Sequence, residues 1–145
     1  MAEGLKLLAE DAADLDIIAA AAQDALVRVS DLAFDKKARR FTALINRFRW
    51  ETAGEQGPYE RVRSALSFES VLNVKSRKVR HDAPEALAAV LQVGFTPAED
   101  PPGGAVQVVL AGGGEIVVEV ECLDALLMDI GAPWRTPRRP DHEGA

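Results

Sequence analysis

The sequence contains little of the chemistry on which many enzymes and secreted proteins depend. Its 145 residues include one cysteine, Cys122, and two histidines, His81 and His142. A single cysteine cannot form an intramolecular disulfide, which excludes a small disulfide-stapled secreted domain. No cysteine or histidine pair has the spacing of a zinc site, and no G-x-S-x-G string marks a serine nucleophile. We therefore expect neither a metal centre nor a cofactor.

Long apolar runs and targeting signals are also missing. A membrane-spanning helix needs about 20 consecutive apolar residues, whereas the longest apolar segment near the N-terminus covers only residues 17–22. The first residues, MAEGLKLLAEDAADLD, lack the basic start and apolar centre of a signal peptide. We expect a cytoplasmic protein without a membrane span.

The composition that remains is that of a globular domain. Apolar residues make up 48% of the chain and charged residues 28%, which is enough apolar material to bury one core. The C-terminal end is rich in proline and arginine and has no hydrophobic period. We expect one α+β domain over residues 1–134 and a flexible tail over residues 135–145.

Most of the chain alternates apolar and polar residues, as half-buried strands do. The alternation predicts eight strands, over residues 5–8, 26–34, 41–50, 62–68, 71–74, 87–95, 106–110 and 116–120. A bulge is expected near Ser30 and Asp31, and an exposed basic connection over Lys75–Asp82. The run Gly112–Gly114 predicts a hairpin turn, because a strand and not a helix follows it and Glu115 would repel a phosphate.

Helices are expected near both ends. Asp11 suits the N-cap of a helix over residues 12–23. A second, amphipathic helix is predicted from four apolar residues at helical spacing, Leu123, Leu126, Leu127 and Ile130. Gly131 and Pro133 would end it. The expected fold is an antiparallel barrel or sandwich of six to eight strands with a helix at each end, an element order that resembles the pleckstrin-homology architecture.

Charge is distributed unevenly along the chain. Residues 28–80 hold thirteen Lys/Arg against six Asp/Glu, a net +7, whereas the remainder holds four against seventeen, a net −13. The two parts can neutralise each other in the fold, or the basic part can bind an anionic partner. The candidate ligand-binding residues are Arg47, Arg49, Arg61, Arg63, Lys75, Arg77, Lys78 and Arg80.

The partner that these cations would bind is left open by the sequence. Phe48, Trp50 and Tyr59 are interleaved with them, as in proteins that stack bases. The sequence pI near 4.9 argues against nucleic acid, because nucleic-acid-binding domains usually exceed a pI of about 9. A non-enzymatic binding or adaptor module that contacts a protein or an anionic ligand is the first hypothesis, and strand edges also make a homodimer plausible.

An enzyme of unassigned class is the alternative hypothesis. Glu115, Glu119 and Glu121 share one strand face, and neighbouring carboxylates can share a proton or hold a hard cation. Cys122 would lie at the start of the predicted second helix, where a thiol pKa can be lowered, with His81 as a base. The three glutamates equally fit a solvated acidic face, and Cys122 equally fits a thiol packed as a small apolar side chain.

Two stretches carry a family resemblance, RRFTALINRFRWE over Arg39–Glu51 and AGGGEIVVEVECLDALLMDIGAPW over Ala111–Trp134. With them, the chain from about Leu5 to Pro140 resembles a small uncharacterised bacterial family of the domain-of-unknown-function kind, found in alphaproteobacteria. The resemblance implies a stand-alone cytoplasmic protein and assigns no activity, substrate or catalytic residue.

Overall fold

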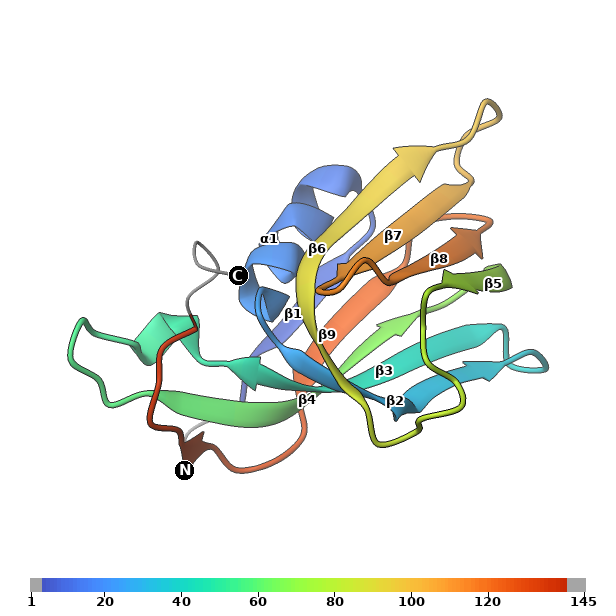
Figure 1. Cartoon of the computed structure of the whole chain (residues 1–145). Helices are drawn as coiled ribbons and strands as arrows, with labels where there is room; N and C mark the ends of the chain where they lie inside the picture. Colours follow the sequence, from blue (N-terminus) through green and yellow to red (C-terminus); the bar gives the residue numbers. More distant parts are fainter. Residues whose placement is uncertain (1–3, 141–145) are drawn as a thin grey trace.

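The computed structural model describes residues 4–140. It contains one α-helix, one short 3-10 helix and ten strands, and every strand pairing is antiparallel (Figure 1). The elements are β1 (Lys6–Ala9), α1 (Ala12–Ala22), β2 (Leu26–Asp35), β3 (Arg40–Phe48), η1 (Trp50–Thr52), β4 (Glu60–Phe68), β5 (Val71–Arg77), β6 (Leu87–Pro97), β7 (Gly104–Leu110), β8 (Glu115–Val120), β9 (Ala125–Asp129) and β10 (Trp134–Arg135).

The strands form one sheet that does not close. Their order is β1-β9-β4-β3-β2-β6-β7-β8-β5, and β10 continues the pairing of β4 beyond β9. The two halves of the sheet join where Leu26–Arg28 of β2 pair with Leu87–Ala89 of β6. The two end strands, β1 and β5, do not pair with each other.

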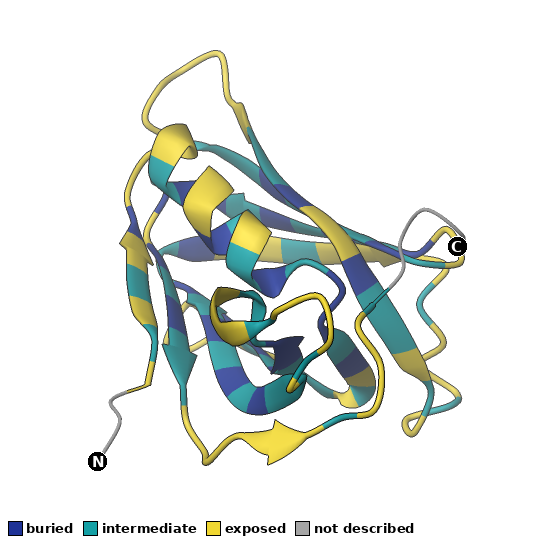
Figure 2. Ribbon diagram, turned by 90° about the vertical axis from the view of Figure 1, so that its left-hand side faces the viewer, coloured by how far each residue is buried: buried dark blue, intermediate teal, exposed yellow. Residues whose placement is uncertain are grey.

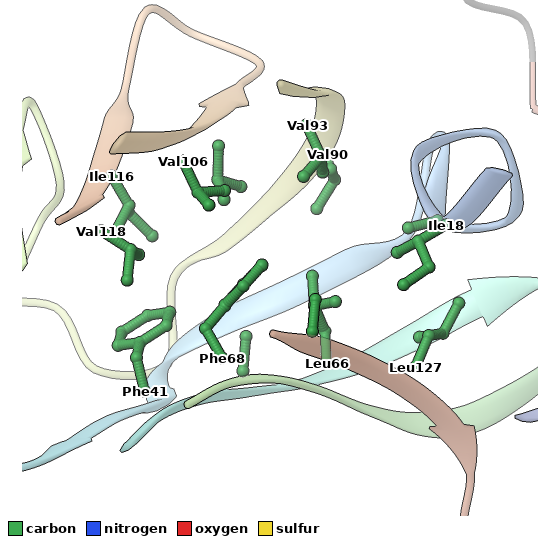
Figure 3. Close-up of a cluster of buried hydrophobic side chains, with 14 of the residues drawn as sticks. Ile18, Phe41, Leu66, Phe68, Val90, Val93, Val106, Ile116, Val118 and Leu127 are labelled. Carbon is green, nitrogen blue, oxygen red and sulfur yellow. The ribbon is translucent and has the colours of Figure 1, made fainter. Parts of the chain in front are cut away.

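The core lies between the two halves of the sheet, which face each other (Figure 3). Phe41, Leu66 and Phe68 point into it from the first half, and Val106 and Val118 from the second (Figure 3). Each large apolar side chain buried in this way contributes about 1.5–3 kcal/mol. Alternation along the strands thus produces two apolar faces that can be buried only against each other.

Helix α1 covers one open end of this core. The Asp11 carboxylate accepts a hydrogen bond from the Asp14 amide at 2.8 Å, which is the expected N-cap. Leu15, Ile18 and Ala22 are buried on the inner side of the helix, and Figure 2 shows exposed residues along its outer side. The predicted first helix is therefore confirmed.

The predicted C-terminal helix is wrong, because this segment forms strand β9. Ala125 and Leu127 face the core, whereas Leu126 lies on the opposite face. The residues lie between β1 and β4 and pair with both. A five-residue apolar segment fits a helix or a strand by its spacing alone, and the two neighbouring strands decide between them. Without that helix, the pleckstrin-homology order loses its final element.

The structure differs from two further predictions, the number of strands and the start of the basic connection. The sheet has ten strands and not six to eight, because β9 and β10 add to the eight predicted from the sequence. The connection predicted over Lys75–Asp82 begins only at Lys78, since β5 continues to Arg77. The predicted bulge in β2 is confirmed by a register shift between Val27 and Leu32.

The predicted tail makes several contacts near its start. Trp134 and Arg135 pair with Arg61 and Glu60 of β4, and the Arg139 guanidinium lies 5.5 Å from the centre of the Trp50 ring. Residues 141–145 of that predicted tail, including His142, lie outside the described residues.

Candidate binding site

The eight cations predicted to bind a ligand do not share one role. Four of them form ion pairs with carboxylates: Arg47 with Glu51 and Asp129, Arg49 with Glu51 and Glu60, Arg63 with Asp31, and Lys75 with Glu119. Arg39 and Arg40 also pair, with Glu121 and Glu69. Three of these carboxylates, Asp129, Glu119 and Glu121, lie outside residues 28–80, so the fold neutralises part of the charge asymmetry.

Arg47 lies in the interior and uses all five of its N–H groups. Its Nε and Nη2 donate to the two oxygens of Asp129 at 2.8 and 2.9 Å. Its Nη1 and Nη2 donate to the two oxygens of Glu51 at 2.9 and 2.7 Å. Nη1 also reaches the carbonyl of Phe48 at 3.3 Å. The Arg47 side chain is fully buried, so this guanidinium serves the fold and is not open to a ligand.

Asp129 completes this cluster from β9. It also accepts hydrogen bonds from the Ser64 hydroxyl at 2.6 Å and from the Leu5 amide at 2.9 Å. Burial alone would raise the pKa of Asp129, but these bonds and those from Arg47 outweigh it and lower the pKa. The hydrogen bond from Arg47 likewise lowers the pKa of Glu51. Both carboxylates are thus held in their charged form.

The lowered pKa values predict a loss of stability in acid. In the unfolded chain both carboxyls titrate near their ordinary values of about 4. The stabilisation is present above that range and is lost as the pH falls toward the lower folded pKa values. We expect urea unfolding to show a lower free energy at about pH 3 than at about pH 7. In the Asp129→Asn variant, the unfolding free energies at these two pH values should differ by less than they do in the wild type. A difference as large as that of the wild type would contradict a role for Asp129.

Arg61, the fifth cation of the set, binds the backbone. Its guanidinium donates to the carbonyls of Asn46 at 2.9 Å and Asp24 at 3.3 Å. It also lies 5.8 Å from the centre of the Phe48 ring. Burial lowers the pKa of Arg61. These contacts tie β4 to β3 and to Asp24 in the turn after α1, so we assign Arg61 to the fold as well.

Three of the predicted cations remain, and we call Arg77, Lys78 and Arg80 the basic segment. None of them forms an ion pair with another residue among 4–140. They lie where β5 ends and the connection to β6 begins. A cavity of about 180 Å³ adjoins them and is lined by Lys78, Arg80, Leu87, Leu110 and Gly112 among others.

The glycine run lies directly beside the basic segment. Gly112 and Gly113 have φ of 88° and 91°, so the run forms the predicted hairpin turn between β7 and β8. A Cβ placed on Gly114 would lie 3.1 Å from the carbonyl oxygen of Lys78. A side chain at this position would press on the Lys78 carbonyl, which shows how closely the turn approaches the backbone of the basic segment.

Three of the residues proposed for an enzyme already have polar partners. Glu119 and Glu121 pair with Lys75 and Arg39, at 2.9 and 2.7 Å. His81 contacts the Ser76 hydroxyl at 2.9 Å. Since residues 125–129 form a strand, the helix predicted to begin after Cys122 does not occur within residues 4–140. Within residues 4–140 no group of three or more metal-ligating side chains occurs.

A larger cavity was not predicted from the sequence. It has a volume of about 630 Å³ and lies over the outer faces of β7 and β8 beside the loop that follows β6. Leu72, Pro97, Pro102 and Val117 give it apolar walls, and Glu119 lies at its side. The only signal in the sequence was the proline-rich stretch Thr96–Gly104, which predicts a loop but no cavity.

The chain belongs to the family described as Protein of unknown function (DUF2948), which matches residues 5–142. The resemblance to a family of the domain-of-unknown-function kind is thereby confirmed. No curated protein matches the chain. Among the residues that the structure covers, no helix has the length and hydrophobicity that crossing a bilayer requires.

Proposed function

We propose that this protein is a non-enzymatic binding module whose protein partner presents an acidic segment to the basic segment. One observation carries the proposal: Arg77, Lys78 and Arg80 are the members of the predicted cation set that neither pair with a carboxylate nor cap the backbone within residues 4–140. Unpaired cations concentrated at one place attract an acidic partner and speed its association.

The state of the reactive side chains supports a binding role over catalysis. A general base or nucleophile needs a free lone pair within reach of a substrate. Asp129 uses both of its oxygens on Arg47, Ser64 and Leu5, while Glu119 and Glu121 are held in ion pairs. Within the basic segment itself, the three cations are exposed, which suits recognition of an anion.

Charge reversal of the basic segment should abolish most of the binding. The probe is fluorescent poly-L-glutamate of about 20 residues at about 50 mM salt, where screening is weak. Three exposed charge contacts of about 0.2–1 kcal/mol each are lost, and charge reversal replaces them by repulsions of similar size. Together these predict a loss of affinity of about tenfold or more in Arg77→Glu/Lys78→Glu/Arg80→Glu. Fluorescence anisotropy measures it, and higher salt should weaken wild-type binding.

The matched control changes the same charge elsewhere. Lys6→Glu/Arg135→Glu/Arg138→Glu reverses three exposed cations that have no ion pair within residues 4–140. We expect this variant to keep its affinity within about threefold, well under the tenfold step of 1.4 kcal/mol. Equal losses in the two variants would reduce the effect to net charge, and absent wild-type binding would remove the proposal. Tighter binding of single-stranded poly-uridine than of poly-glutamate would identify nucleic acid as the partner instead.

A further inference from the structure

Strand β5 ends the sheet and has one edge without a partner. It pairs with β8 alone. The Val71 amide donates to the carbonyl of Arg39 at 2.9 Å, at the tip of the β2–β3 hairpin. From residue 72 to residue 77, no backbone hydrogen bond other than those of the β8 ladder occurs among residues 4–140. Such an edge can accept a further strand.

The two faces of β5 differ in chemistry along this edge. Lys75 and Arg77 stand opposite Val117 and Glu115, on the outer face of the sheet. Val74 stands opposite the buried Val118 and packs against the core. A strand placed beside β5 would therefore meet cations with one set of alternate side chains and the apolar rim of the core with the other.

The space beside the start of this edge is open. A cavity of about 400 Å³ is lined there by Phe34, Lys36, Arg39, Val71, Leu72 and Asn73. Leu72 is 55% exposed. Apolar groups thus lie at the start of the edge and at Val74, and the cations Lys75 and Arg77 lie toward its end.

We propose that the acidic segment of the partner binds as an additional antiparallel or parallel strand on the free edge of β5. The recognised sequence alternates acidic residues with β-branched apolar residues. The acidic side chains face Arg77, which has no ion pair within residues 4–140, and Lys75, which would share its charge between the partner and Glu119. The apolar side chains face Val74. This inference rests on the function proposed above and adds the mode of binding: main-chain hydrogen bonds supply affinity, and the alternating faces supply specificity.

A second copy of this chain fits the edge less well. Lys75 and Arg77 are the charges that β5 itself presents, and like charges placed opposite each other destabilise a strand pair. The other end strand, β1, carries Lys6 and no acidic residue. Lysine on an edge strand disfavours pairing between two copies of the same protein. The same lysine attracts a strand that carries acidic residues.

The test uses peptides in which glutamate and valine alternate over about eight residues, with both ends blocked. One peptide is unmodified, one is N-methylated on every valine, and one on every glutamate. A strand bonds to its neighbour through the amides of alternate residues. We expect one methylated peptide to lose at least tenfold in affinity and the other to stay within about threefold of the unmodified peptide. Hydrogen exchange should slow at residues 72–77 when the unmodified peptide binds.

The outcomes separate this inference from the function on which it rests. Salt-sensitive binding with equal losses for both methylated peptides, and no protection of residues 72–77, would overturn strand addition and leave the acidic partner standing. No binding of either the alternating peptide or poly-glutamate would overturn both. Sedimentation that shows a dimer held through β5 would assign the edge to a second copy and contradict the inference.

Discussion

Replacing Arg47 by methionine should lower the free energy of unfolding by about 3–5 kcal/mol, because it leaves the buried carboxylate of Asp129 without its counter-charge. Asp129, whose side chain is 5% exposed, loses two hydrogen bonds, and Glu51 loses two more. A domain of this size has about 5–15 kcal/mol of stability in total. Urea unfolding at neutral pH, followed by circular dichroism, measures the loss.

Two further variants show whether burial of the charge causes this loss. Arg49→Met removes a neighbouring arginine whose ion pairs are partly exposed, and it should cost about 1 kcal/mol or less. Arg47→Met/Asp129→Asn removes the charge that Arg47→Met leaves uncompensated, so the double variant should be more stable than Arg47→Met alone. A double variant at least as unstable as the single one would show that packing, not charge, dominates at this site.

This cluster also shows what sequence patterns can and cannot reveal about the site. Arg47 follows Ile45 in the strand and occupies the same face, where an apolar residue would be expected. The other members of the cluster come from separate parts of the chain: Glu51 follows Arg47 by four residues, Asp129 comes from β9, and Ser64 of β4 donates to Asp129. No spacing rule connects such residues, so the sequence predicted the cation but assigned it to ligand binding. The basic segment was predicted correctly as exposed at Lys78 and Arg80, since a polar connection without an apolar period has few neighbours.

The fold was predictable where alternation is long and uninterrupted. The hairpin of β7 and β8 around Gly112 and Gly113 follows from two alternating runs and one glycine turn. The same reasoning fails for β9, which is short and begins just after the strand β8. There the neighbours of the segment, not its own residues, determine its conformation. The end of β5 was missed for a similar reason, because Lys75 and Arg77 belong to an edge with only one partner strand.

Leu127→Asp should unfold the protein, whereas Leu126→Asp should leave it folded. In strand β9 successive side chains point to opposite faces, so Leu127 is fully buried against the core (Figure 3) and Leu126 lies on the outer face. A helix over the same residues would place Leu126 and Leu127 on one apolar face together. Burying an unpaired carboxylate costs several kcal/mol, which is comparable with the whole stability of the domain.

The two variants carry the same substitution at adjacent positions, so each is the control for the other. We expect Leu126→Asp to lower the free energy of unfolding by about 1 kcal/mol, as is usual for partly exposed sites. Circular dichroism and thermal melting of both proteins measure the difference. Equal losses would indicate the helix that the spacing of Leu123, Leu126, Leu127 and Ile130 first suggested. If Leu126→Asp is folded and Leu127→Asp is unfolded, the segment is a strand, because only a two-residue period places adjacent side chains on opposite faces.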